Sequence, residues 1–255
     1  ISHTYEQLPG VGTNESNKIN FSSKNNNMPS RGEESDDIEK CNFKVVSQNV
    51  NGLRNEVKRK IIFEKLSKEG EIVCLQETHS TPEDEKQWKE ECEGEVFFSH
   101  GASNARGVMI YFAKNIEVEL IKSTIDNEGR YIVLDGKIQG TRFLLYSIYA
   151  PNNKEEHKQF LTTIKDLVCN KADSEIQYKI SAGDWNFTEE NMDRLGGNYT
   201  IWKENVQILN EINEKSDSID IWRVRNPEKK QYTWRRRKPA IHSRIDRIYI
   251  SDTLQ

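Results

Sequence analysis

Residues 142–152 read Arg-Phe-Leu-Leu-Tyr-Ser-Ile-Tyr-Ala-Pro-Asn. The first eight are mostly aliphatic or aromatic, which predicts a buried β-strand, and Ala150-Pro151-Asn152 supplies turn residues that end it. Similar runs follow one another between residues 96 and 149, whereas elsewhere segments with helical spacing of apolar residues separate them. This mixture predicts an α/β domain with a mixed sheet, because a purely parallel sheet would need a crossover after every strand.

The other expected elements share these two patterns. Short apolar runs bounded by turn residues predict strands at 43–48, 72–76, 107–113, 131–134, 142–149, 178–182 and 245–250. Apolar residues three or four positions apart predict helices within 57–66, 160–168 and 206–212.

Composition excludes several classes of protein. The 255 residues carry 37 Lys+Arg and 41 Asp+Glu, a net charge of −4, and no run approaches the ~18 apolar residues of a membrane span. The first residues do not resemble a secretory signal. The cysteines form no C-x-x-C pair, so we expect all four to be reduced; they are Cys41, Cys74, Cys92 and Cys169. We therefore expect an intracellular protein with no membrane partner.

Residues 1–40 differ from the rest of the chain. They are rich in Asn and Ser and carry four basic and seven acidic residues. A segment with so few apolar residues cannot bury enough surface to offset its ordering entropy. The sequence therefore predicts a disordered acidic tail over 1–40 and one folded domain over 41–255.

Residues 221–250 have the opposite charge. They contain ten basic and two acidic residues, a balance of +8, and Trp222, Tyr232 and Trp234 lie among them. Basic side chains interleaved with aromatic ones are typical of surfaces that bind a phosphate backbone. The alternative is an ordinary solvated loop.

Polar side chains recur where the expected strands begin or end. They are Asn49, Glu77, Tyr149, Asp184, Asn186 and Asp246. Each alone has a structural explanation, such as a turn or a solvated carboxylate. Together they predict a cleft lined by oxygen ligands, which suit Mg²⁺ rather than zinc. Carboxylates and a bound Mg²⁺ beside a basic segment are what phosphodiester hydrolysis requires.

Five motifs in this order resemble a known superfamily. They are Gln48-Asn-Val-Asn-Gly-Leu-Arg54, Leu75-Gln-Glu-Thr-His79, Ile148-Tyr-Ala-Pro-Asn152, Gly183-Asp-Trp-Asn186 and Ser243-Arg-Ile-Asp-Arg-Ile248. Over residues 41–250 the chain resembles the endonuclease/exonuclease/phosphatase superfamily. It is most similar to the apurinic/apyrimidinic (AP)-like endonuclease domain of non-LTR (LINE-type) retrotransposons. The residues Met192-Asp193-Arg194, which follow the fourth motif, also resemble that group.

This resemblance implies a four-layered α/β sandwich with two packed mixed sheets, as in DNase I-like folds. It implies that Glu77 and Asn49 hold Mg²⁺, with Mn²⁺ as an alternative ion. Tyr149 would contact the scissile phosphate, Asp184 would orient or deprotonate water, and Asn186 would position the phosphate. Asp246 would orient a late histidine. Thr233 would buttress the site and Arg194 would contact DNA. From the basic segment itself we expect phosphate or DNA contacts from Trp234, Arg235, Arg236, Arg237 and Arg244.

The resemblance also implies a closing Ser-Asp-His motif, whereas this sequence ends at Gln255. We therefore expect the last strand of one sheet to be missing, and whether this fragment is active stays open. In a full-length protein we expect a reverse-transcriptase domain as a partner, a monomeric state, and action on DNA in the nucleus.

Two other functions remain open. The same site would serve a repair enzyme of the AP endonuclease and exonuclease III type, although the Gln-Glu-Thr-His and Asp-Trp-Asn variants favour the retrotransposon group. A non-catalytic remnant that binds nucleic acid through the basic segment is the alternative from another class.

Overall fold

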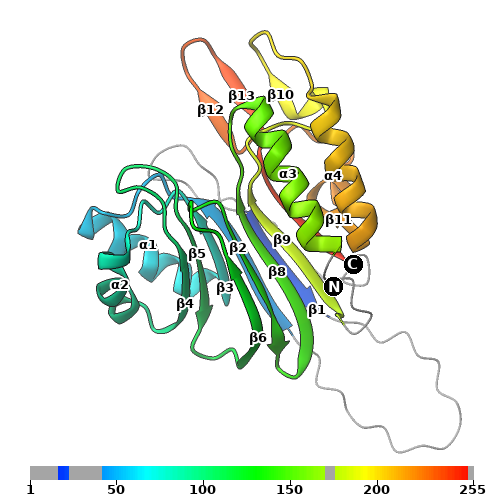
Figure 1. Ribbon diagram of the computed structural model, residues 1–255. Coiled ribbons are helices and arrows are strands. Elements are labelled where there is room, and N and C mark those ends of the chain that lie inside the picture. Colours follow the sequence, from blue (N-terminus) through cyan, green and yellow to red (C-terminus); the bar gives the residue numbers. More distant parts are fainter. Residues whose placement is uncertain (1–16, 23–41, 170–175, 252–255) are drawn as a thin grey trace, which may run out of the picture.

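Two β-sheets pack face to face, and helices cover the outer face of each, in the computed structural model of the chain (Figure 1). The structure describes residues 17–22, 42–169 and 176–251. The first sheet has the order β1 (Asn17–Ser22), β2 (Asn42–Asn49), β3 (Ile72–Gln76), β5 (Val108–Ala113) and β4 (Gly94–Ser99). The second has the order β11 (Ser218–Asp220), β14 (Asp246–Ser251), β9 (Tyr178–Asp184), β8 (Thr141–Tyr149), β7 (Tyr131–Ile138) and β6 (Val118–Ile125).

A third, small sheet extends from one end of the sandwich (Figure 1). It has the order β10 (Arg194–Leu195), β13 (Ile241–Ser243) and β12 (Trp234–Arg236). The helices are α1 (Glu56–Glu69), α2 (Glu85–Glu91), α3 (Lys154–Cys169), α4 (Lys203–Ser216) and α5 (Ile221–Arg225), with short 3₁₀ turns η1 (Pro82–Asp84) and η2 (Asn191–Asp193).

Alternating side chains of the strands build separate layers of core. Val45 of β2 and Cys74 of β3 face the second sheet, whereas Val46 and Val73 face the other way. Because successive side chains of a strand point to opposite faces, one strand supplies both layers. Phe63 of α1 lies in the same outer cluster as Val46, so α1 covers the outer face of the first sheet.

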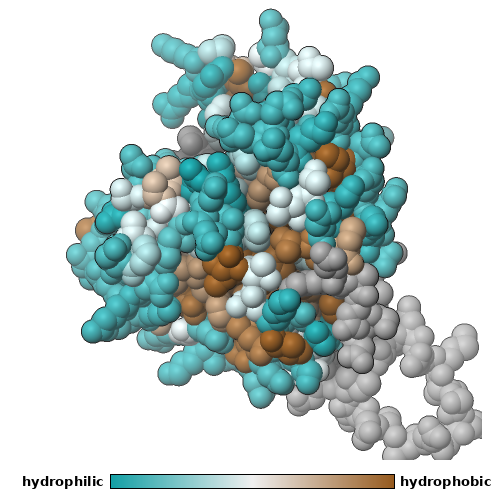
Figure 2. All heavy atoms as spheres, in the orientation of Figure 1, coloured by the Kyte–Doolittle hydropathy of each residue, from teal (hydrophilic) through white to brown (hydrophobic). Residues whose placement is uncertain are grey.

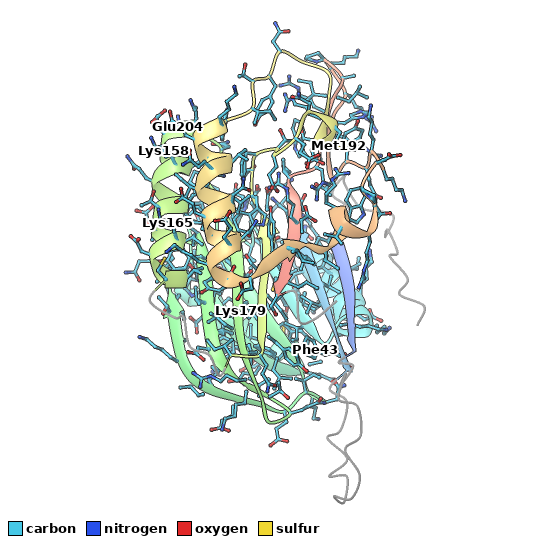
Figure 3. The ribbon with its side chains drawn as sticks, turned by 90° about the vertical axis from the view of Figure 1, so that its right-hand side faces the viewer. Phe43, Lys158, Lys165, Lys179, Met192 and Glu204 are labelled. Carbon is cyan, nitrogen blue, oxygen red and sulfur yellow. The ribbon has the colours of Figure 1, made fainter. Side chains whose placement is uncertain are left out.

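Helices α3 and α4 cover the second sheet. Phe160, Leu161 and Ile164 of α3 and Leu209 and Ile212 of α4 are buried in one cluster with residues of β7, β8 and β14. On their solvent side the two helices are joined by ion pairs, Lys158–Glu204 at 2.7 Å and Lys165–Glu211 at 2.9 Å (Figure 3). The order helix, sheet, sheet, helix confirms the predicted four-layered sandwich.

Strand directions bring distant motifs to one edge of the sandwich. β2 and β3 are parallel, and so are β8 and β9, so the carboxyl ends of each pair lie together. β14 is antiparallel to β9, and its first residue, Asp246, pairs with Asp184 at the end of β9. The ends of β2 and β3 therefore lie together, and so do the ends of β8 and β9 and the start of β14. These are the positions of the polar residues that the sequence singled out.

Part of the predicted tail is ordered. Residues 17–22 form β1, which pairs with β2, so the prediction of disorder is wrong for these six residues. Apolar residues at 19 and 21 alternate with polar ones, the period of a strand, and β1 satisfies the backbone groups along that edge of β2. The other residues of 1–40 lie outside the described part of the chain.

The small three-stranded sheet and α5 did not stand out in the sequence. Their elements are two to five residues long, which is too short for a periodic pattern. Within the described ranges, no helix has an apolar stretch long enough to cross a lipid bilayer.

Candidate active site

Four side chains from both sheets form a hydrogen-bonded group at this edge. The Asn49 side-chain nitrogen donates to Glu77 Oε1 at 2.9 Å and to Asp184 Oδ2 at 3.0 Å. The Tyr149 hydroxyl donates to the same Glu77 oxygen, also at 2.9 Å. The ends of β2 and β8, the end of β9 and the residue after β3 are thereby fixed to one another. The structure thus brings together residues that are 135 positions apart.

Strained backbone holds two of these loops. Glu77 and His79 have φ angles of 53° and 57°, and Asn186 has 51°, a region that residues other than glycine rarely adopt. Neighbouring loops hold the strain in place: Gly52 N–H donates to Glu77 O at 2.7 Å, and His79 N–H donates to Arg106 O at 2.9 Å. Strain of this kind persists where surrounding structure enforces it, and it clusters at functional sites.

Asn186 is fixed at both ends. Its backbone N–H donates to Asp184 Oδ1 at 2.9 Å, and its side-chain nitrogen donates to Ala150 O at 2.7 Å. The turn after β9 is thereby tied to the turn after β8. Gly183 is needed before it, because a Cβ at that position would lie 2.0 Å from Ile148 O of the adjacent strand.

Two buried carboxyl groups lie beside this group. Asp184 is 3% exposed and Asp246 is 4% exposed, and the two are paired across β9 and β14. Burial raises the pKa of Asp184, and the charge of Asp246 raises it further. Burial likewise raises the pKa of Asp246 to about 6, although the Thr233 hydroxyl opposes the rise. The site therefore holds more negative charge than its surroundings neutralise.

Glu77 is the more open carboxylate. Its side chain is 25% exposed, and its second oxygen, Oε2, lies 3.8 Å from His79 Nε2. Tyr149 stays protonated as its partner, because burial and the charge of Glu77 raise the pKa of the phenol. Glu77 thus keeps one oxygen for a group that enters from solvent.

The carboxylate oxygens of this site suit a hard cation whose other ligands are water and substrate oxygens. No group of three His, Cys, Asp or Glu side chains in the described ranges could hold a metal ion without help. Mg²⁺ needs only one or two carboxylates, with waters and phosphate oxygens completing its shell. Glu77 supplies such an oxygen, and the buried Asp246 Oδ1 has no hydrogen-bond partner among the described residues.

The basic segment forms an exposed hairpin beside this edge. Arg235 and Arg236 lie in β12, and Arg237 lies in the turn to β13; all three are exposed, and Trp234 is partly buried. The surface of this projecting end is mostly hydrophilic (Figure 2). A positive, projecting arm of this kind suits a phosphate backbone.

Thr233 and Arg194 lie at the base of the hairpin. The buried Thr233 hydroxyl oxygen accepts hydrogen bonds from the backbone N–H groups of Ile245 and Asp246, both at 3.1 Å. Arg194 donates to Ser243 Oγ at 3.0 Å, and its guanidinium lies 4.4 Å from the centre of the Tyr199 ring. Thr233 thereby fixes the backbone at the start of β14, beside Asp246.

Arg244 differs from its expected role in contacting DNA. It is 3% exposed, and its guanidinium donates to Asp193 at 2.7 and 3.1 Å and to Asp220 at 2.6 Å. A side chain that is 3% exposed and paired with two carboxylates is not accessible to a phosphate at the surface. The prediction is wrong because residue type and neighbourhood in sequence do not show burial.

Three basic side chains near the site were missed. The Arg130 guanidinium lies 5.2 Å from the centre of the Tyr149 ring. Lys58 Nζ donates to Val50 O at 2.6 Å and to Asn51 O at 2.9 Å, and so braces the loop after Asn49. His157 is fully buried below the site. Arg130 directly precedes β7, so a search for polar side chains at strand starts, which found Asp246, could also have found it. Lys58 and His157 lie within α1 and α3 and give no such signal.

His157 has a structural role in its neutral form. Its Nε2 lies 2.7 Å from Trp185 O, and the Asn205 side-chain nitrogen lies 2.9 Å from its Nδ1. Burial lowers the pKa of His157 to about 4. The ring therefore links α3, α4 and the loop after Asp184 without carrying charge at neutral pH.

Comparisons with known proteins show the family of the chain and relatives of its fold. The sequence pattern of the Endonuclease/Exonuclease/phosphatase family matches residues 46–255. The chain is 34% identical over 213 residues to the "Transposon TX1 uncharacterized 149 kDa protein" of Xenopus laevis. That match covers 82% of this chain but 16% of the relative, so the chain spans about a sixth of the relative's length.

Solved structures share the fold. AP endonuclease LMAP from Leishmania major is 18% identical with a TM-score of 0.62, covering 82% of this chain and 79% of that one. The Xenopus laevis APE2 catalytic domain is 20% identical with a TM-score of 0.63, covering 82% of each chain. The Neisseria 3′ phosphatase NExo, solved with a product DNA hairpin, is 18% identical with a TM-score of 0.61, covering 82% of this chain and 87% of that one.

Proposed function

This chain belongs to the endonuclease/exonuclease/phosphatase family, and on that premise we propose that it is the Mg²⁺-dependent DNA endonuclease domain of a non-LTR retrotransposon protein. One observation carries the proposal: Glu77, Asn49, Tyr149 and Asp184 form a single hydrogen-bonded group beside an exposed arginine hairpin. Its reaction would be hydrolysis of one phosphodiester bond, which nicks a target strand. The transposon relative supports the retrotransposon context.

In this proposal Glu77 and Asn49 would hold Mg²⁺. A bound Mg²⁺ offsets the charge of the phosphate and of the leaving oxygen. Asp184 accepts a proton from the attacking water, a role that its raised pKa favours once the group is ionised. The Tyr149 hydroxyl and the Asn186 amide orient the phosphate, and the hairpin arginines hold the flanking backbone.

Plasmid nicking tests the proposal. We expect nicked circles to accumulate with Mg²⁺, or with Mn²⁺ in its place, and not with EDTA. We expect Glu77→Ala to lower the rate by about 10²-fold or more, the scale of losing one positioned charged group. Glu95→Ala, which removes an exposed acid of β4, is the matched control. Both the 255-residue chain and the full protein that its gene encodes are assayed; nicking that survives Glu77→Ala in both would refute the assigned site.

A repair AP endonuclease is the second candidate, and the likeness of the fold to two such enzymes favours it. The strand-end group would serve either substrate. A duplex with one abasic site, compared with undamaged plasmid at equal concentration, separates the two functions. Strong preference for the abasic duplex would favour repair.

The same proposal includes a monomeric state and a fused reverse-transcriptase domain. It also includes action in the nucleus, because a retrotransposon endonuclease acts on chromosomal DNA. Size-exclusion chromatography and the location of a tagged full-length protein test them.

A further inference from the structure

A largely buried ion cluster lies where the chain passes from the basic hairpin to Asp246. Its members are Asp193, Asp220, Arg223 and Arg244, and we call it the hairpin joint. They come from three segments of the chain. Asp193 ends η2, Asp220 ends β11 and Arg223 lies in α5, which follows it, and Arg244 lies between β13 and β14. Met192, which precedes Asp193, lies at the same end of the domain as the hairpin (Figure 3).

The contacts of the hairpin joint are specific. Arg244 binds Asp193 with two nitrogens, at 2.7 and 3.1 Å, and its backbone N–H also donates to Asp193 O at 2.8 Å. The third nitrogen reaches Asp220 at 2.6 Å. Arg223 pairs with the same Asp193 carboxylate. The side chain of Asp193 is fully buried.

An aromatic ring completes the arrangement. The guanidinium groups of Arg223 and Arg244 lie 4.9 and 5.0 Å from the centre of the buried Trp222 ring. Two acidic and two basic groups leave the cluster neutral. Buried pairs of this kind add little net stability compared with apolar packing, but removing one partner leaves a buried charge uncompensated. Such a cluster therefore serves to hold one particular geometry.

The chain around Arg244 connects the hairpin to the site. Ser243, before it, accepts a hydrogen bond from Arg194 on its hydroxyl, and its carbonyl accepts one from Thr233 N–H at 3.0 Å. Ile245, after it, accepts one from Trp185 N–H at 2.8 Å on its carbonyl oxygen. Asp246 comes next. A shift of Arg244 would therefore move the hairpin, the loop after β9 and a site carboxylate together.

We propose that the hairpin joint fixes the orientation of the DNA-contacting hairpin relative to Asp184 and Asp246, with Asp193 and Arg244 as positioning residues. This inference rests on the proposed function, in which the hairpin binds DNA and the two carboxyl groups belong to the site of cleavage. It gives the two residues a role in alignment rather than in direct contact with DNA. It also accounts for the burial of Arg244, which with Arg247 is one of the two buried basic residues in the segment 221–250.

The experiment uses Asp193→Asn and Arg244→Lys in the 255-residue chain. Lysine keeps the charge but not the two-pronged contact with Asp193. Native trypsin cleavage after Arg235, Arg236 or Arg237 reports how firmly the hairpin is held, since Pro239 blocks cleavage after Lys238. We expect both variants to be cut there about tenfold faster than the unmodified chain, because local opening becomes easier. Asp135→Asn is the control, since it breaks the part-buried Arg142–Asp135 pair at 2.9 Å on β7 and β8, away from the hairpin.

The salt dependence of duplex DNA binding separates alignment from contact. Loss of one phosphate contact lowers the slope of log K against log salt by about 0.9. We expect that change for Arg236→Ala, and an unchanged slope for Arg244→Lys and Asp193→Asn. For these two variants we expect the nicking rate at saturating DNA to fall.

Two outcomes would overturn the inference: hairpin cleavage no faster than in Asp135→Asn, or a slope for Asp193→Asn that falls as in Arg236→Ala. If Asp193→Asn does not fold, as judged by circular dichroism, Asp220→Asn replaces it, because it removes only one of the three Arg244 side-chain contacts. If the unmodified chain neither binds nor nicks DNA, the proposed function fails, whereas the trypsin comparison still decides whether the joint holds the hairpin.

Discussion

Asp184 and Asp246 face each other across the antiparallel pair of β9 and β14, and both carboxyl groups are almost completely buried. Like charges directly opposite each other destabilise a sheet. The fold accepts this arrangement where the Asn49 amide, the Thr233 hydroxyl and the loop after β9 surround the two groups. At this pair the protein loses stability in order to hold two carboxyl groups together.

Replacing Asp246 by asparagine should stabilise the metal-free protein. The pKa of Asp246 is raised to about 6, so the folded state holds its proton more tightly than the unfolded state, and stability falls as pH rises from about 4 to about 6. We expect Asp246→Asn to exceed the unmodified chain by about 3 kcal/mol in unfolding free energy at pH 7, and to differ little near pH 4. Urea unfolding in EDTA measures both. A variant that is less stable at pH 7 would contradict the prediction.

His157 should give the protein a pH dependence of opposite sign. Its pKa is lowered to about 4, so the unfolded state binds the proton first, and stability is lost as pH falls from about 6.5 to about 4. Between pH 7 and pH 5 this single group removes about 2 kcal/mol. Glutamine can donate to Trp185 O and accept from Asn205, so His157→Gln should abolish that loss. Urea unfolding at the two pH values compares the variant with the unmodified chain; equal losses in both would exclude His157 as the source.

Tyr149 should matter for rate more than for stability. Tyr149→Phe removes the hydroxyl that donates to Glu77 Oε1, so we expect plasmid nicking to slow by about 10²-fold. The unfolding free energy should fall by about 1 kcal/mol, the net worth of one hydrogen bond. Tyr111→Phe on β5 removes a hydroxyl that donates to Glu93 O at 3.2 Å and is the control. Unchanged nicking by Tyr149→Phe would remove this hydroxyl from the mechanism.

The exposed hairpin arginines should set the salt dependence of binding. Combined replacement of Arg235, Arg236 and Arg237 by alanine should lower the slope of log K against log salt by about 2–3, since each phosphate contact accounts for about 0.9. The control removes three positive charges from α3 and α4, with Lys158, Lys165 and Lys215 replaced by alanine. Fluorescence anisotropy with a labelled duplex gives both slopes. Equal slopes in the two triple variants would mean that net charge, not the hairpin, attracts DNA.

The sequence predicted most long elements because burial leaves a periodic trace. The strand over 142–149 and the helical face of Phe160, Leu161 and Ile164 were both found in this way. The small sheet, α5 and β1 were missed, because they are short and lack the continuous apolar run that reveals the equally short β3. Only contacts with neighbouring strands stabilise them.

The site was predictable as a set of residues but not as a geometry. Asn49, Glu77, Tyr149, Asp184 and Asn186 each follow or end a strand, and that position alone brought them into the prediction. That one Glu77 oxygen accepts from both Asn49 and Tyr149 follows only from the packing of the two sheets. Sheet packing depends on all the side chains of the interface at once, which no local pattern contains.

What the sequence by itself determined is the chemistry available: oxygen ligands at strand ends, a segment of +8 charge, and five ordered motifs. What only the tertiary structure decided is which of those charges face solvent. Arg236 and Arg244 belong to the same basic segment, yet one is exposed on the hairpin and the other is saturated by Asp193 and Asp220. Burial depends on partners that lie 51 and 24 residues away, so the charge of a residue is local information whereas its availability is not.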